Sequence, residues 1–263
     1  MPQLFQPTLL RYDSLPSTNT EAAGQATRGA PEGLCVVAGE QTQGRGRRER
    51  VWASPAGAGL YFSLVLRPRL PPEAWPLITL MAALAVRDAL LESCALQTDI
   101  KWPNDILAAS NGRKLCGILA EAIETKRGRA CILGIGINLS ERAYPPELQA
   151  HATSIEAATG TAADLERVLA ALIKHLAQRY AQLHAPAAGQ SEIIRDWSAN
   201  SSYAEGKCVR VHAATESFNG MTRGLEPDGA LRVETATGEI KRVRAGDVQA
   251  LRHETGDKTD GSH

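Results

Sequence analysis

The sequence lacks an excess of charge of either sign. Lys and Arg together number 29 among its 263 residues, and so do Asp and Glu, which gives a formal net charge of zero at pH 7. Proteins that attract polyanions through their overall charge need a net positive surface. The balance therefore excludes such attraction for the chain as a whole, and any site for an anion has to be local.

Long apolar segments and a secretory signal are also missing. The best candidate, residues 75–91, meets Arg87 and Asp88 before it reaches the roughly 20 apolar residues that a membrane-spanning helix needs. The N-terminal segment shows neither a basic start followed by an apolar core nor a small-residue cleavage site. We therefore expect a cytoplasmic protein without membrane association, in which residues 75–93 form a buried helix.

Several signatures of metal sites and active sites are absent. The 5 cysteines form no CxxC pair and are odd in number, which favours free thiols in a reducing compartment over a disulfide or zinc framework. The 6 histidines are scattered, and the chain contains no HExxH, no P-loop and no GxSxG. These absences argue against a metal held in a cage of protein side chains, and we expect no protein metal site.

The most informative segment that is present is EQTQGRGRRERVW, residues 40–52, with 4 arginines and 2 glycines between positions 44 and 50. It lies between two expected strands, residues 34–42 and 59–68, which is the layout of a binding loop held by a sheet. Arginine binds phosphate or carboxylate through two parallel hydrogen bonds, and glycine lets the backbone approach the same anion. The alternative is a solvated or RNA-binding patch, but no aromatic residue for base stacking lies within the run.

Two further segments contain candidate polar groups. Lys114 begins KLCGIL, where it is either a strand-edge charge with its ammonium in water or a point charge in a cleft, with Gly117 leaving room for a ligand. In KWPND, residues 101–105, Asn104 and Asp105 follow the end of an expected strand, where binding sites often assemble. Asp105 could equally be a turn residue alone. GIGIN, residues 134–138, lacks the GxGxxG pattern of a dinucleotide site.

The rest of the chain predicts a large domain followed by a small one. Within residues 98–109 we expect a strand that stops at Pro103, with a turn at Asn104-Asp105. Further strands are expected over residues 114–124 and 129–140, and helices over residues 164–183 and 191–199. Thr18 and Glu21 have the spacing of a capping box at the start of another helix. From residue 203 onward, short strand-like segments separated by Asp-Gly and Thr-Gly turns predict a small barrel. The predicted domains are residues 1–200 and 203–252, followed by a disordered tail over residues 253–263.

Five motifs in order carry a resemblance to a known family: STN, EQTQGRGRRERVW, KWPND, KLCGIL and GIGIN. From about Ser14 to Leu251 the chain resembles the biotin protein ligases, or biotin-[acetyl-CoA-carboxylase] ligases. The resemblance implies an α+β fold, in which a mixed β-sheet catalytic domain of the class II synthetase-like type carries helices packed on it. A small C-terminal SH3-like β-barrel follows.

The same resemblance implies an activity and partners. Such an enzyme joins biotin to ATP as biotinyl-5'-AMP and then transfers biotin to one lysine of a biotin carboxyl carrier protein. Mg²⁺ would accompany the nucleotide, and homodimerisation would follow by analogy. Arg45, Arg47 and Lys114 fall on the positions that neutralise the reacting anions, and Asp105 falls on that of the carboxylate that receives the acceptor lysine. The residues expected to bind biotin and the adenylate are Ser17, Thr18, Asn19, Gln41, Gly44, Arg45, Gly46, Arg47, Trp52, Lys114, Gly117 and Asn138.

Two features depart from the family pattern. Glu49 stands where the family usually has glycine, which places a carboxylate beside the arginines. Only about sixteen residues precede STN, fewer than a winged helix-turn-helix needs, so we expect no DNA binding. The alternative functions are a lipoate-protein ligase, which shares the catalytic fold, and a non-enzymatic RNA-binding module.

Overall fold

The computed structural model describes residues 5–142, 144–148, 150–186, 188–213 and 216–251. Its larger part is built on a seven-stranded sheet with the order β1-β2-β3-β7-β6-β5-β4. β1 and β2 are parallel, and the other neighbours are antiparallel. The strands are β1 (Thr8–Leu15), β2 (Leu34–Gln41), β3 (Gly59–Leu66), β4 (Thr98–Lys101), β5 (Asp105–Ala108), β6 (Lys114–Thr125) and β7 (Gly128–Asn138).

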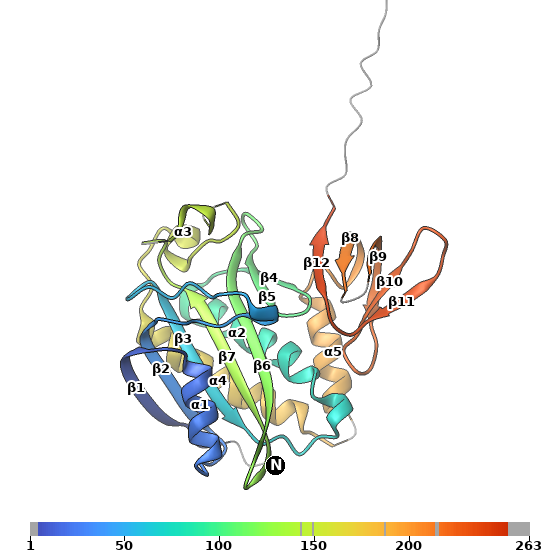
Figure 1. Ribbon diagram of the computed structural model, residues 1–263. Coiled ribbons are helices and arrows are strands. Elements are labelled where there is room, and N and C mark those ends of the chain that lie inside the picture. Colours follow the sequence, from blue (N-terminus) through green and yellow to red (C-terminus); the bar gives the residue numbers. More distant parts are fainter. Residues whose placement is uncertain (1–4, 143, 149, 187, 214–215, 252–263) are drawn as a thin grey trace, which may run out of the picture.

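Helices cover both faces of this sheet, as Figure 1 shows. They are α1 (Thr18–Thr27), α2 (Leu77–Cys94), α3 (Ile155–Thr159), α4 (Leu165–Leu183) and α5 (Gly189–Ala199). Successive strand residues point to opposite faces. Accordingly, Val36 packs in a small apolar cluster with Ala22 of α1, whereas Val37 belongs to the main core that includes α2 and α4.

The predicted buried helix is confirmed as α2. Residues 72–94 are long and apolar enough to cross a membrane by length and composition, but 67% of their most apolar window is buried inside the structure. The helix begins at Leu77, two residues later than predicted, and Ala95 follows its last residue in a left-handed conformation. The apolar side chains of α2 therefore pack in the core between the sheet and α4.

The smaller part of the structure is a five-stranded antiparallel sheet with the order β11-β10-β9-β8-β12. It lies beside α5 in Figure 1, and we call it the C-terminal domain. Its strands are β8 (Glu205–His212), β9 (Ser217–Leu225), β10 (Leu231–Glu234), β11 (Ile240–Val243) and β12 (Asp247–Ala250). Gly229 and Gly238 have φ of 83° in the turns that flank β10, a conformation that glycine adopts without strain. The predicted succession of short strands is confirmed.

Local structure departs from the predictions at two points, β1 and the start of α1. β1 was not expected, because the first residues lack a clear alternation of apolar and polar side chains. Residues 98–109 form the hairpin of β4 and β5, in which a turn at residues 102–104 follows the strand that was predicted to stop at Pro103. The capping box does not form: Ser17 is the N-cap of α1, and the hydroxyl of Thr18 donates to Gln41 Oε1 at 3.1 Å. Residues 253–263 lie outside the described residues.

Candidate active site

Two cavities meet at the arginine loop, residues 44–52, which lies over strands β6 and β7 of the main sheet. The inner cavity, about 230 Å³, lies over β6 and β7 and is lined by Thr18, Trp52 and Lys114 among others. The outer cleft, about 940 Å³, lies between the loop, the start of α2 and the C-terminal domain. Both cavities share Arg45 and Arg47 in their walls, so these side chains stand at the passage between them.

The floor of the inner cavity depends on glycines of β6 and β7. Gly117 and Gly136 are paired across the two strands, and the indole of Trp52 lies against both. A Cβ atom would lie 2.9 Å from Cζ3 of Trp52 at Gly117 and 2.6 Å from Cε2 of the same ring at Gly136, closer than side chains approach. At Gly134 a Cβ atom would lie 2.8 Å from Cγ of Asn19. The glycines of GIGIN therefore make room for side chains of the site.

One end of the inner cavity carries a buried polar network. Gln41 Oε1 accepts hydrogen bonds from the backbone N–H of Thr18 at 2.8 Å and from its hydroxyl, while Gln41 Nε2 donates to Ser54 Oγ at 2.8 Å. The hydroxyl of Ser63 lies 2.8 Å from Thr18 Oγ1 and 2.6 Å from Asn19 Oδ1. Because buried polar groups are costly to reorient, this network fixes the side chains that face the cavity.

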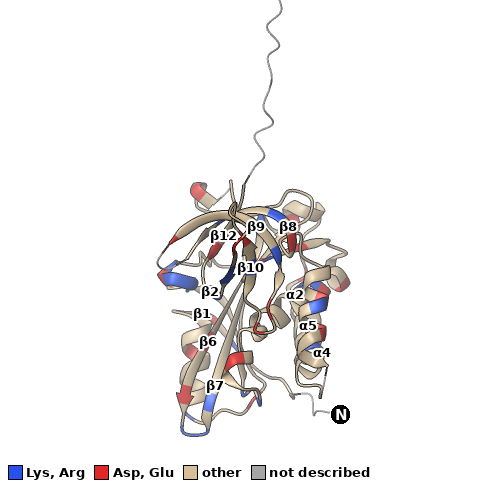
Figure 2. Ribbon diagram, turned by 90° about the vertical axis from the view of Figure 1, so that its right-hand side faces the viewer, with Lys and Arg blue, Asp and Glu red and all other residues tan. Residues whose placement is uncertain are grey.

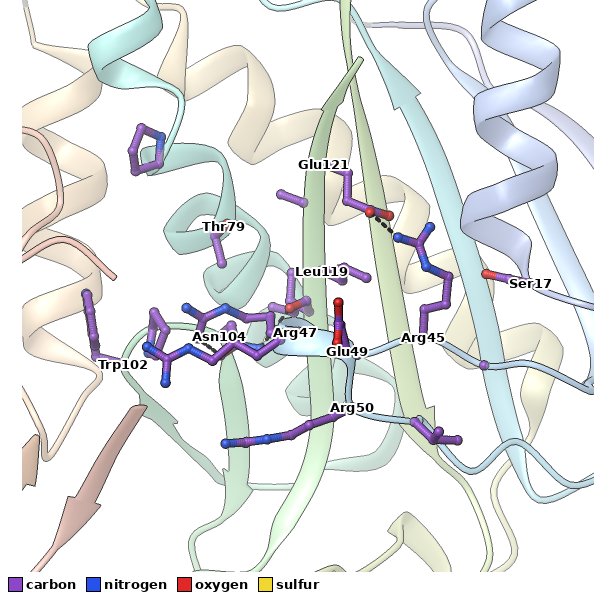
Figure 3. A pocket seen from close by; sticks show the side chains of 18 of the residues that line it. Ser17, Arg45, Arg47, Glu49, Arg50, Thr79, Trp102, Asn104, Leu119 and Glu121 are labelled. Atoms are coloured by element: carbon purple, nitrogen blue, oxygen red, sulfur yellow. Dashed lines mark hydrogen bonds and ion pairs between the residues drawn. The ribbon is translucent and has the colours of Figure 1, made fainter. Parts of the chain in front are cut away.

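The network continues to the arginine loop through Glu121 of β6. Asn19 Nδ2 donates to Glu121 Oε2 at 2.8 Å, and Arg45 donates to Glu121 Oε1 at 2.5 Å. Figure 3 shows this ion pair at one side of the outer cleft. Glu121 thus joins the start of α1 to the first arginine of the loop, a role that no local sequence pattern indicates because 102 residues separate Glu121 from Asn19.

Lys114 and Asp105 lie together at the other end of the inner cavity. Lys114 Nζ is 2.6 Å from Asp105 Oδ1 and 5.2 Å from the centre of the Trp52 ring, while Lys101 Nζ is 3.9 Å from Asp105 Oδ2. Only 33% of the Lys114 side chain is exposed. The sequence left open whether Lys114 is a strand-edge charge in water or a charge in a cleft. The structure supports the second interpretation.

A segment that the sequence had not singled out closes this end. The backbone N–H of Lys114 donates to the carbonyl of His151 at 2.9 Å, and Asn138 Nδ2 donates to the carbonyl of Thr153, also at 2.9 Å. Tyr144 and His151 line the cavity from this side. Burial raises the pKa of the Tyr144 hydroxyl far above its usual value, and this hydroxyl has no hydrogen-bond partner among the described residues.

The arginine loop itself is a short hairpin. Gly46 N donates to the carbonyl of Arg50 at 2.7 Å, and Trp52 N donates to that of Gly44 at 2.9 Å. At its tip, Arg48 has φ of 53° and Glu49 has φ of 61°. Left-handed backbone costs a non-glycine residue about 1 kcal/mol or more, so glycine at position 49 would fit this conformation better than Glu49 does.

The loop places Arg47 between the two domains. Arg47 Nη1 donates to Asn104 Oδ1 at 3.0 Å and to the carbonyl of Gly246 at 3.2 Å (Figure 3 shows the first bond). Burial lowers the pKa of the Arg47 guanidinium, and the nearby Asp247 carboxylate counteracts this shift. The side chain is held at the passage between the cavities, where an anion would meet it.

Comparison with known proteins identifies the family. Residues 12–138 match the model of the Biotin/lipoate A/B protein ligase family, and residues 206–250 match the Biotin protein ligase C terminal domain. A bifunctional ligase/repressor BirA of Bacillus subtilis is 40% identical over 246 residues, covering 92% of this chain and 73% of that protein. The chain belongs to the biotin protein ligases.

Other members of the biotin protein ligases agree in sequence and fold. A biotin--[acetyl-CoA-carboxylase] ligase of Mycobacterium tuberculosis is 34% identical over 242 residues, which cover 90% of this chain and 86% of that enzyme. The structure of the Aquifex aeolicus biotin protein ligase in complex with biotin and ATP has a TM-score of 0.79 and 29% identity, covering 94% of this chain and all of that one. The predicted family and fold are confirmed.

The biotin protein ligase motifs, far apart in the sequence, converge on the two cavities. Gly44 lines only the outer cleft. The other predicted residues line the inner cavity: Ser17, Thr18, Asn19, Gln41, Arg45, Gly46, Arg47, Trp52, Asp105, Lys114, Gly117 and Asn138. Their individual roles stay predictions. Sequence reasoning missed Ser63, Glu121 and Asp247, whose contacts all lie far away along the chain.

Proposed function

We propose that this biotin protein ligase activates biotin with ATP in the inner cavity and transfers it to a lysine of a biotin carboxyl carrier protein. The observation that carries the proposal is the position of Lys114, whose ammonium lies beside Asp105 and Trp52 beneath the arginine loop. A cationic cavity of this kind suits a reaction between two anions, a carboxylate and a triphosphate.

The first half-reaction forms biotinyl-5'-AMP. A biotin carboxylate oxygen attacks the α-phosphorus, the bond from that phosphorus to the bridging oxygen breaks, and pyrophosphate leaves. Lys114 lines the inner cavity, and Arg45 and Arg47 stand at the passage between the cavities; together they would offset the charge that builds up at the α-phosphate. Their hydrogen-bonded partners hold them in place before the substrates arrive, which avoids a cost of reorganisation during the reaction.

Mg²⁺ would enter with the nucleotide. Bound to phosphate oxygens, it supplies additional positive charge at the triphosphate. Asp105 and Asp247 line the inner cavity and pair with its cationic side chains, as Glu121 does with Arg45, but no three His, Cys, Asp or Glu side chains among the described residues gather into a metal site. The triphosphate and water would therefore provide most of the oxygen ligands.

The two ends of the inner cavity suit the two halves of the adenylate. The network of Thr18, Asn19 and Gln41 offers donors and acceptors in fixed positions, as a polar ureido ring requires. At the other end, the indole of Trp52 and the wall near Tyr144 would offer flat surfaces to an adenine ring. Biotin would thus lie next to α1, and adenine would lie beside Asn138.

The second half-reaction needs a neutral amine on the carrier. With a reference pKa of about 10.4, only ~0.04% of a lysine side chain is neutral at pH 7, a handicap of roughly 4.6 kcal/mol. Asp105 would orient the incoming lysine or accept its proton, because it is a carboxylate that lines the inner cavity beside Lys114. The carrier would be the biotinyl domain of acetyl-CoA carboxylase. A cytoplasmic location, homodimerisation and the lack of DNA binding remain predictions.

The arrangement of charge favours this function over RNA binding. Basic and acidic residues alternate over the ribbon in Figure 2, and the arginines of the loop pair with Glu121 and Asp247. RNA-binding surfaces instead expose basic side chains together with aromatic residues for base stacking.

The test is exchange of radioactive pyrophosphate into ATP, followed by transfer to a purified biotinyl domain. We expect biotin to stimulate the exchange and the biotinyl domain to gain one biotin. Exchange that responds to lipoate and not to biotin would assign the chain to lipoate ligation. Salt-sensitive RNA binding without any effect of biotin would favour the non-enzymatic alternative.

A further inference from the structure

One carboxylate of the C-terminal domain forms ion pairs with three arginines of the arginine loop. Asp247, the first residue of β12, has Oδ1 3.7 Å from Arg47 Nη1 and Oδ2 3.8 Å from Arg48 Nη1. Arg50 donates to Oδ2 of the same carboxylate in the closest contact of the three. The side chain of Asp247 is 21% exposed, so the three arginines pair with a partly buried negative charge.

The loop needs an anchor of this kind. Arg48 and Glu49 hold left-handed backbone conformations at its tip, and the side chain of Val51 is 81% exposed. Apolar packing therefore contributes little to the order of the tip. Three like charges within one short segment also repel one another unless an anion lies between them.

The base of the loop is anchored separately. Arg45 is bound by Glu121, which belongs to the sheet of the larger domain. Asp247 thus holds the C-terminal half of the loop from a different domain, at a separation of 197 residues from Arg50. A guanidinium has five N–H donors, so Arg47 can keep its bonds to Asn104 and Gly246 while its other donors face a phosphate.

We propose that Asp247 is a positioning residue for the nucleotide. It holds the arginine loop folded over the inner cavity before ATP arrives, and the C-terminal domain thereby sets the affinity for ATP. Asp247 acts through the arginines and makes no contact with the reacting atoms. The proposal rests on the proposed function, because it assumes that the loop arginines meet the triphosphate.

The decisive variant is Asp247→Asn, which keeps the shape of the side chain and removes its charge. Glu234→Gln is the matched control, since Glu234 pairs with Arg223 at 2.6 Å within the C-terminal domain and lines neither cavity. Asp247→Glu serves as the conservative variant. Each protein is assayed by biotin-dependent pyrophosphate exchange and by trypsin cleavage within the loop, whose arginines are natural trypsin sites.

For Asp247→Asn we expect the KM for ATP to rise about tenfold, while the KM for biotin and the kcat change less than about twofold. Trypsin should cleave the free variant in the loop at least about fivefold faster than wild type, because the loop opens more often. Glu234→Gln should match wild type in both assays, and Asp247→Glu should recover most of the affinity for ATP.

An unchanged KM for ATP in Asp247→Asn would overturn the proposal. A lowered KM for ATP would also overturn it, because it would mean that Asp247 competes with the phosphates for the arginines. Equal losses of ATP and biotin affinity would also overturn it, since they would indicate general damage. Cleavage by trypsin requires no activity. If the wild type fails to use biotin, the proposed function fails, while an equal cleavage rate in variant and wild type would independently refute the anchoring of the loop.

Discussion

Substitution of Gly134 by alanine tests how the floor of the inner cavity positions the biotin end. Gly134 does not have a left-handed backbone, so alanine introduces no backbone strain. Its methyl group would instead lie 2.8 Å from Cγ of Asn19, a buried side chain that is 4% exposed. Asn19 would have to leave its position, because the sheet backbone beneath Gly134 is paired with β3 and β6 on both sides.

The cost follows from the bonds that Asn19 makes. Moving its amide breaks the contact with Ser63 Oγ at 2.6 Å and the bond to Glu121 Oε2 at 2.8 Å. A neutral hydrogen bond contributes about 1 kcal/mol and one to a charged group about 1.5–3 kcal/mol. We therefore expect the free energy of unfolding to fall by about 2–4 kcal/mol and the Kd for biotin to rise at least about tenfold.

The assays are urea unfolding and isothermal titration with biotin alone. Gly136→Ala is the matched variant, because position 136 lies on the same face of β7 and its methyl group would meet the indole of Trp52 instead of Asn19. That variant should raise the KM for ATP more than the Kd for biotin. If Gly134→Ala binds biotin as wild type does, or if the two variants lose biotin affinity equally, the assignment of the two ends of the cavity is wrong.

Three other substitutions test single side chains. Lys114→Met should slow adenylate formation about 100- to 1,000-fold in single-turnover experiments, because a charge at the α-phosphate is lost. It should alter the free energy of unfolding by less than about 1 kcal/mol, since Asp105 keeps Lys101 as a partner. Asp105→Ala should slow transfer from preformed adenylate to the carrier about 100-fold and adenylate formation less than about tenfold. Glu49→Gly should lower the KM for ATP about two- to fivefold by removing a carboxylate beside the arginines and relieving a left-handed residue.

Each of these expectations has a clear contrary result. Adenylate formation within tenfold of wild type in Lys114→Met would remove that lysine from the catalytic set. Equal slowing of both half-reactions in Asp105→Ala would show that its main contribution is to hold Lys114. A higher KM for ATP in Glu49→Gly would mean that the carboxylate helps to order the loop.

The sequence predicted the parts of the site that local patterns reveal. The arginine loop, the buried helix and the strands that begin with Lys114 and end with Asn138 each have a signature within a dozen residues. The position of Lys114 in a cleft needed the structure, because a lysine at the start of a strand has the same pattern whether it points to solvent or inward.

The missed features are all long-range contacts. Glu121 contacts Asn19 and Arg45, and Asp247 contacts the arginine loop. These residues are far apart in the sequence, so no local periodicity predicts the contacts. The capping box was mispredicted for a related reason. The hydroxyl of Thr18 was expected to cap its own helix, but Gln41, brought close by the sheet, offers a partner that the local sequence does not contain.

The packing of Trp52 on Gly117 and Gly136 has an optical consequence. Of the four tryptophans in the chain, Trp102 and Trp197 are buried in the core, and Trp52 is the one that lines the inner cavity. Its indole N–H has no hydrogen-bond partner among the described residues, and an ammonium group stands 5.2 Å from the ring. A ligand that enters the cavity changes the surroundings of this chromophore directly, so the protein carries an intrinsic fluorescent reporter of its own occupancy.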